Sequence, residues 1–107
     1  MAHIAVFSWY PPSKAAEVTA VFNKGQQNIS PIFQKSNGPY TWATRDGVET
    51  FAAYEVANNK LYEAFIELHA ALAQYAGIEG YRYDIRSVGG SGDAEPLQKA
   101  ISRRQSK

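Results

Sequence analysis

Arg82, Asp84 and Arg86 form an alternating row of charges in the last third of the chain. Residues two apart in an extended strand share a face, so these three side chains would point the same way. Two guanidinium groups on one face can bind a carboxylate or phosphate through paired hydrogen bonds. The row also fits an edge strand whose charges discourage wrong pairing, or ion pairs with Glu49 and Glu55 across a dimer. The pattern therefore predicts an anion-binding rim or a protected strand.

Several aromatic side chains have the size and polarity to line a ligand cavity. Indole N–H and phenol O–H groups offer hydrogen bonds in otherwise apolar surroundings, which suits a flat or amphipathic molecule. A subunit interface would use the same residues, and both interpretations hold together where an interface is incompletely filled. The predicted ligand-binding residues are Trp9, Tyr40, Trp42, Phe51, Arg82 and Arg86.

His69 is the candidate for acid–base chemistry. It lies four residues after Phe65, beside the apolar stripe of a predicted helix, and could act as a general base or a haem ligand. The alternative is a helix-flank histidine with a satisfied hydrogen bond. With two histidines and no cysteine, the chain has no metal-ligand spacing. We therefore predict no metal and no cofactor.

Length and charge limit the classes of protein. A chain of 107 residues supports one domain with one core. Eleven Lys and Arg against ten Asp and Glu leave it nearly neutral, without the basic footprint of a nucleic-acid binder. No segment reaches the length of a membrane span, and residues 1–7 resemble a strand more than a signal peptide. We expect a cytoplasmic protein whose partner is a small molecule or another protein chain.

Hydrophobic periodicity predicts six elements in the order βαββαβ. Alternating residues indicate strands at 3–10, 40–45, 48–56 and 81–86, and apolar spacings of three and four indicate helices at about 13–25 and 60–76. Residues 25–38 are expected to form an ordered loop with a turn at Ser30-Pro31, either a flap over a pocket or a loop pinned by hydrophobic anchors. We assign residues 1–88 to the folded domain and 89–107 to a flexible linker at 89–93 and a tail with a short helix at 94–102.

The dipeptide Asp46-Gly47 predicts how the two middle strands pair. Asp-Gly favours a two-residue hairpin turn, which would place Trp42 opposite Phe51 and Tyr40 opposite Ala53. Tyr40, Trp42 and Phe51 would then share one face of the sheet. The other face is apolar too, so both faces must be covered.

These elements predict an α+β fold, the ferredoxin-like plait. Two split βαβ units with right-handed crossovers give a four-stranded antiparallel sheet in the spatial order four-one-three-two, with both helices on one face. Burying a large aromatic side chain gains roughly 1.5 to 3 kcal/mol, so the aromatic face should be covered by a second subunit. The residues expected on that face are Phe7, Trp9, Tyr40, Glu49, Phe51, Trp42, Glu55, Arg82, Asp84 and Arg86.

The chain resembles the dimeric α/β-barrel superfamily, which includes the antibiotic-biosynthesis-monooxygenase-like domains. The resemblance rests on the element order over residues 3–88 and on Ser-Trp-Tyr-Pro-Pro at 8–12, Tyr-Glu-Val at 54–56 and Ile-Glu-Gly-Tyr at 78–81. It implies that two sheets pack face to face into a barrel, and that the space between sheet and loops of each subunit can hold a ligand. Cofactor-independent oxygenation or isomerisation of an electron-rich ring is the activity it implies. The haem-degrading Asn, Trp and His set of that group is not matched, since the first strand has no Asn, so no catalytic residue transfers.

Three functions fit these features. The first is a homodimeric barrel that binds a small amphipathic or aromatic ligand, with or without the implied oxygenase or isomerase activity. The second is a structural or interaction protein whose aromatic face is only a subunit interface. The third is an RNA-recognition-motif-like module, which shares the element order. Against the third, residues 48–54 lack the basic-Gly-aromatic-Gly signature, and Glu49 and Glu55 would flank the stacking surface.

Overall fold

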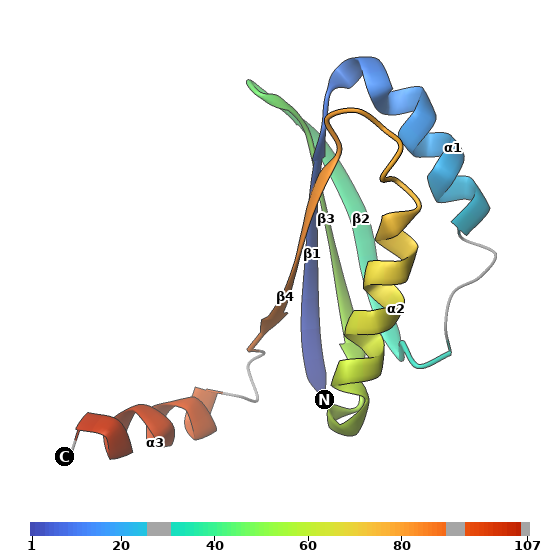
Figure 1. Ribbon diagram of the computed structural model, residues 1–107. Helices are drawn as coiled ribbons and strands as arrows, with labels where there is room; N and C mark the ends of the chain where they lie inside the picture. The colour runs from blue at the N-terminus through green and yellow to red at the C-terminus, as the bar shows by residue number, and fades with distance from the viewer. Residues whose placement is uncertain (26–30, 90–93, 106–107) are drawn as a thin grey trace.

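The protein folds into one antiparallel sheet with two helices on one face and a third helix beyond it (Figure 1). The computed structural model describes residues 1–25, 31–89 and 94–105. Short 3-10 turns at Pro12–Lys14 and Asn58–Lys60 lead into the first two helices. The elements are β1 (Ala2–Tyr10), α1 (Ala15–Gly25), β2 (Lys35–Thr44), β3 (Gly47–Val56), α2 (Leu61–Ala73), β4 (Arg82–Val88) and α3 (Ala94–Gln105).

The strand order confirms the predicted ferredoxin-like plait. The four strands lie in the order β2-β3-β1-β4, which is the expected order four-one-three-two read from the other edge. β1 is central and pairs antiparallel with both β3 and β4. Its central position explains why both of its alternating residue sets are apolar, since one set faces the helices and the other lies on the open face.

The predicted hairpin register is wrong by two residues. Thr44 pairs with Gly47, so Arg45-Asp46 form the turn, and Trp42 lies opposite Glu49 instead of Phe51. The Thr44 side chain closes this turn: its Oγ1 donates to the Gly47 carbonyl at 2.8 Å and accepts from the Asp46 amide at 3.2 Å. A shift of two residues preserves which side chains share a face, so the predicted face assignment holds.

The core lies between the sheet and α2. Ile4 and Val56 from the sheet are fully buried, and they cluster with Ala64 and Leu68 of α2. Partly buried side chains pack around this cluster, including Phe33, Tyr54, Phe65 and Ile85. The core is therefore built on the face of the sheet that α2 covers, and the open face of the sheet is left outside it.

Several boundaries differ from the predictions. β2 begins at Lys35, inside the segment expected to be a loop, with an irregularity in pairing between Asn37 and Tyr40. α2 ends at Ala73, three residues early, and α3 continues to Gln105, three residues beyond the predicted end. The expected turn at Ser30-Pro31 and most of the 89–93 linker lie outside the described residues. No helix among the described residues is long and apolar enough to cross a membrane.

Candidate functional site

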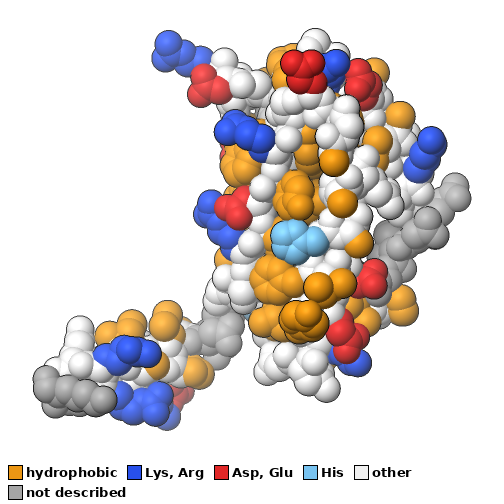
Figure 2. Space-filling model, viewed as in Figure 1, with side chains coloured by type: hydrophobic (Ala, Val, Ile, Leu, Met, Phe, Trp, Pro, Cys, Tyr) orange, Lys and Arg blue, Asp and Glu red, His pale blue; other side chains and the backbone are white. Residues whose placement is uncertain are grey.

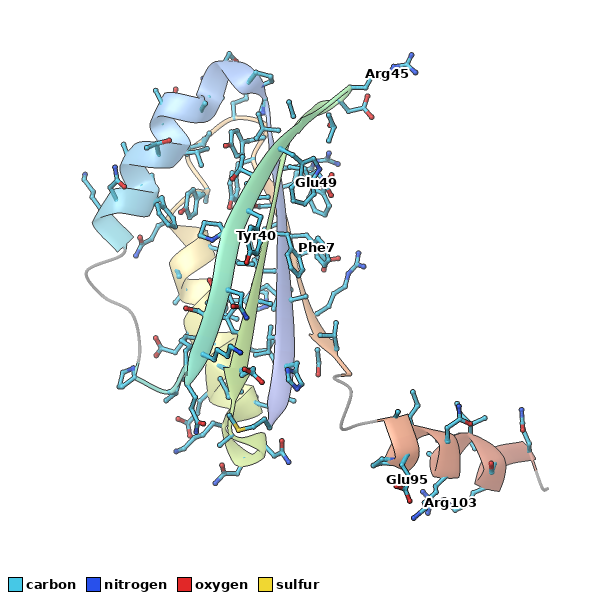
Figure 3. All side chains as sticks on the ribbon, turned by 180° about the vertical axis from the view of Figure 1, so that it is seen from behind. Phe7, Tyr40, Arg45, Glu49, Glu95 and Arg103 are labelled. Atoms are coloured by element: carbon cyan, nitrogen blue, oxygen red, sulfur yellow. The ribbon has the colours of Figure 1, made fainter. Side chains whose placement is uncertain are left out.

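The structure places all six predicted ligand-binding residues on the open face of the sheet. Trp9 pairs across the strands with Glu49 and Arg82, and Tyr40 pairs with Phe51. Figure 3 shows Phe7 and Glu49 on the side of the sheet away from α1 and α2. Tyr40 and Trp42 are 56% and 42% exposed, so this surface is a wide aromatic face and not a closed pocket.

The two arginines of the charge row already have partners on this face. The guanidinium carbons of Arg82 and Arg86 lie 5.7 Å and 5.1 Å from the ring centroids of Trp9 and Phe7. Arg86 Nε also donates to Asp84 Oδ2 at 2.6 Å. These contacts favour the interpretation that the row protects the edge strand β4, because both guanidinium groups lie over aromatic rings of the neighbouring strand.

The two glutamates of the open face, Glu49 and Glu55, have other neighbours than the charge row. Glu55 Oε1 lies 3.6 Å from His3 Nδ1, and Glu55 Oε2 lies 4.0 Å from Lys35 Nζ. Glu49 lies in register between Trp9 and Trp42. The ion pairs of these glutamates with Arg82 or Arg86 were expected across a dimer, and that expectation stays a prediction.

His69 stands apart from the aromatic face. It is exposed on α2, its Nδ1 lies 3.3 Å from the Tyr83 hydroxyl, and the two rings meet edge to face at 5.8 Å. It lines neither of the two cavities on the helix side of the sheet. The geometry is that of a flank histidine with a satisfied hydrogen bond, which was the alternative to a catalytic role.

The concave site of the molecule lies on the helix side of the sheet. A cavity of about 370 Å³ opens between β1, β2 and β3 below and α1 and α2 above. A second cavity of about 250 Å³ adjoins it towards the end of β1. We call the two together the helix-side cavity, because they share the lining residues Val6, Phe22, Pro39, Tyr54, Leu72 and Tyr75.

A stack of tyrosines forms one wall of the helix-side cavity. The Tyr75 and Tyr81 rings stack at 4.6 Å with an interplanar angle of 9°, and Tyr10 stacks on Tyr81 at 6.3 Å. Tyr54 contacts Phe33 at 5.0 Å on the sheet side. The stack joins β1, the turn after α2 and the segment before β4, so its formation depends on the tertiary fold and not on one element.

Burial raises the pKa of the Tyr54, Tyr75 and Tyr81 hydroxyls above its ordinary value of 10.0. Removal from water raises the pKa of Tyr75 to about 12, with a further upward effect from the neighbouring tyrosines. Burial also raises the pKa of Tyr54. The pKa of Tyr81 is raised by burial, and a hydrogen bond with the Ser8 hydroxyl acts in the opposite direction. The hydroxyls therefore offer hydrogen bonds without charge.

Ser8 and Thr50 add a pair of hydroxyls to the floor of the cavity. They face each other on β1 and β3 and share a hydrogen bond, and Ser8 is only 5% exposed. Among the described residues that line the helix-side cavity, Glu67 alone carries a charge. The site is thus an apolar cavity with neutral hydroxyl groups, suited to an uncharged ligand.

Sequence reasoning missed this cavity. Tyr54, Tyr75 and Tyr81 were not among the predicted ligand-binding residues. The available signal was chemical: three tyrosines, a serine and a threonine carry hydroxyls that need hydrogen-bond partners on the side of the sheet that the helices cover. No group of His, Cys, Asp or Glu among the described residues could hold a metal ion.

The fold and site define a ferredoxin-like α+β protein with a tyrosine-lined cavity between sheet and helices. No protein-family model matches the chain, and no curated protein matches it significantly. Among solved structures, the chain is similar to a dimeric ferredoxin-like protein of unknown function from Thermobifida fusca YX. That likeness has a TM-score of 0.45 and 15% identity, over 81% of this chain and 92% of that one.

A second solved structure is a monooxygenase from the gene ActVA-Orf6 of Streptomyces coelicolor, in complex with nanaomycin D. Here the TM-score is 0.45 and the identity 17%, over 84% of this chain and 89% of that one. Likenesses at this level carry no conclusion about activity.

Proposed function

We propose that the protein binds a small, uncharged, largely apolar ligand, such as a hydroxylated aromatic compound, in the helix-side cavity. The observation that carries this proposal is the cavity of about 370 Å³ lined by neutral tyrosine hydroxyls. Known ligand sites have volumes of roughly 300 to 1,000 Å³, with mostly apolar walls and a few polar groups that fix orientation. The oxygenase or isomerase activity implied by the resemblance stays a prediction, as does a cytoplasmic location.

The polarity of the cavity argues for the chemical class of the ligand. Tyr75 and Tyr81 present stacked rings, which suit a flat aromatic molecule. The Ser8–Thr50 pair and the tyrosine hydroxyls can donate to or accept from a hydroxyl or carbonyl group. An anionic ligand would lose its hydration without gaining a cationic partner, because no Lys or Arg lies among the described lining residues.

We further propose that the open face of the sheet pairs two copies into a homodimer. Tyr40 and Trp42 are too exposed for a stable bare surface, and Phe7 and Phe51 extend the apolar area with a ring contact at 5.2 Å. The position of Glu49 between Trp9 and Trp42 argues against single-stranded RNA as the occupant, since its carboxylate would repel phosphates. The predicted ligand site on the open face then becomes an interface.

The binding experiment is a calorimetric titration with 2-naphthol, a flat uncharged phenol. Ala71→Phe places a ring in the cavity from α2, whereas Ala73→Phe makes the same change on the same helix at a position that does not line it. We expect binding to the unmodified protein and to Ala73→Phe, and its loss in Ala71→Phe. Naphthalene-2-sulfonate, the charged analogue, should bind more weakly.

Three results would count against this proposal. Equal binding to Ala71→Phe and Ala73→Phe would place the ligand elsewhere, and loss of binding in Trp42→Ala would favour the open face. If 2-naphthol and a panel of similar uncharged compounds give no heat, the second function is favoured, a structural or interaction protein. The cation–π contacts that already cover part of the open face are consistent with that role.

A further inference from the structure

The third helix exposes an apolar strip without a partner. Leu97 and Ile101 lie one helical turn apart on α3, so they share a face, and they are 59% and 40% exposed. α3 has no buried residue and lies off the body of the fold in Figure 1. A helix of 12 residues is marginal in water by itself, so α3 is expected to need a surface to pack on.

A second exposed apolar strip lies on the outer side of α2. Tyr62 and Ile66 are also one turn apart and are 77% and 51% exposed, while Ala64 and Leu68 face the core. Tyr83 of β4 is 37% exposed and flanks this surface through its contact with His69. Figure 2 shows hydrophobic side chains gathered along this side of the molecule. We call Tyr62 and Ile66 the outer strip of α2.

The two strips belong to helices of opposite charge. α3 carries three basic residues, Lys99, Arg103 and Arg104, against the single acid Glu95. α2 carries Glu63 and Glu67 and no Lys or Arg within its bounds. Glu95 pairs with Lys99, and Lys60 pairs with Glu63, on exposed surfaces where an ion pair contributes little, so a contact between helices would lose little by replacing these pairs.

The placement of the charges favours antiparallel packing. Two of the three basic residues of α3, Arg103 and Arg104, lie in its last turn, and Glu63 lies in the first turn of α2. An antiparallel pair brings these ends together and opposes the two helix dipoles. In that arrangement Leu97 would meet Ile66 and Ile101 would meet Tyr62.

The chain connectivity favours a second copy as the partner in this arrangement. β4 ends at Val88, opposite His3, and α2 begins just after Val56, opposite Ala2, so a chain's own α3 starts near the beginning of α2. To pack antiparallel on the α2 of its own chain, α3 would have to start at the other end of α2. That end is roughly 17 Å away, because a helix of this length rises about 1.5 Å per residue. The residues 89–93 would have to span this distance and the width of a helix, whereas α3 of another copy has no such constraint.

We propose that α3 of one copy docks, antiparallel, on the outer strip of α2 of a second copy. This contact is separate from the helix-side cavity and from the open face of the sheet. It gives the carboxyl-terminal helix a function, as an arm that joins copies of the chain.

Disulfide trapping tests the contact without interference, because the chain has no cysteine of its own. Leu97→Cys is mixed with a tagged Ile66→Cys protein under mild oxidation, and the mixed disulfide is identified by its mass. Ser102→Cys replaces Leu97→Cys in the control, because residue 102 lies away from the apolar face of α3. We expect the mixed disulfide with Leu97→Cys and its loss with Ser102→Cys.

Two outcomes would overturn the proposal. One is a Leu97→Cys/Ile66→Cys double variant that forms only an intramolecular disulfide, with no mixed product between single variants, which would mean that α3 packs on its own chain. The other is equal trapping at residues 97 and 102, which would mean random collision.

Hydrogen exchange of the unmodified protein supplies an independent readout. Docking between copies predicts that exchange in α3 slows as protein concentration rises, and that Ile66→Glu removes this dependence. Protection that does not vary with concentration, or its persistence in Ile66→Glu, contradicts the proposal. Binding of 2-naphthol to Ile66→Glu should be retained, so failure of the arm contact and failure of the cavity are distinguishable.

Discussion

The neutral tyrosines of the helix-side cavity predict a loss of stability at alkaline pH that can be assigned to one side chain. Tyr75 stacks on Tyr81 at 4.6 Å, and burial raises its pKa from 10.0 to about 12. In the unfolded chain the hydroxyl ionises at its ordinary pKa. Below pH 10 both states are protonated, so this difference in pKa does not affect stability there. As the pH rises from 10 to 12, the unfolded state releases its proton first and the folded state is destabilised.

The size of the effect follows from the pKa difference. A pKa difference of about two units, at about 1.36 kcal/mol per unit, limits the loss of unfolding free energy to about 2.7 kcal/mol. Tyr75 is only half-buried, and solvent screens part of this cost. We therefore expect Tyr75 to account for roughly 1 to 1.5 kcal/mol of the stability lost between pH 10 and pH 12.

The measurement compares the unmodified protein with Tyr75→Phe by denaturant unfolding at both pH values. Lysine and arginine titrations are common to both proteins and cancel in the difference. Tyr75→Phe should lose less stability over this range, and its tyrosinate absorbance titration should lack one hydroxyl that ionises near pH 12. If the two proteins lose the same free energy of unfolding, Tyr75 is solvated and the cavity wall described above is wrong.

Four further substitutions test other parts of the structure. Gly47→Ala should cost about 1 to 3 kcal/mol of unfolding free energy in denaturant melts, because Gly47 has φ +135° and a Cβ would lie 2.9 Å from the Tyr10 carbonyl oxygen; an unchanged midpoint contradicts the turn geometry. Ile4→Ala should lower the free energy of unfolding by roughly 2 to 5 kcal/mol, because the Ile4 side chain is fully buried. A loss as small as that expected at an exposed site would show that Ile4 is not a core residue. Ser8→Ala should cost about 1 to 3 kcal/mol by leaving a polar partner unpaired on the buried floor, and the double variant Ser8→Ala/Thr50→Val should cost less than the sum of the single changes. In the Ile66→Glu background, which removes the proposed contact of α3 with another copy, Trp42→Ala should lower the sedimentation mass from dimer to monomer while 2-naphthol binding is kept; an unchanged mass would remove the open face as the interface.

The topology could be predicted from sequence because it depends on the spacing of apolar residues along the chain. β1 is apolar on both alternating sets, which required a central strand, and α2 repeats its apolar residues with helical spacing. Short connections and right-handed crossovers then left few alternatives for the strand order. The faces of the sheet followed from alternation alone.

The hairpin register depended on an interaction that composition does not reveal. Asp46-Gly47 is a strong turn signal, but Gly47 does not lie in the turn. The Thr44 hydroxyl donates a hydrogen bond across the turn to the Gly47 carbonyl, and Gly47 is the first residue of β3, close to the Tyr10 carbonyl. The choice between the two registers is thus made by one side chain and by the neighbouring strand. Because the two registers differ by two residues, the error left the face assignment intact.

The site could not be predicted because it is a property of the space between elements. Tyr54, Tyr75 and Tyr81 come from a strand, a helix end and a loop, and only the packed fold stacks or gathers them. Their aromatic rings satisfied the hydrophobic pattern, which concealed their hydroxyls. Trp9 and Trp42, which were predicted to bind the ligand, lie on the open face and not in the helix-side cavity.

Chemical-shift mapping of 2-naphthol on isotope-labelled protein shows on which side of the sheet the ligand binds. We predict that the largest shifts fall on Tyr54, Leu72 and Tyr75, whose side chains line the helix-side cavity. The indole signals of Trp9 and Trp42 should move little. Shifts concentrated at the two indoles, with the cavity residues unchanged, would contradict it.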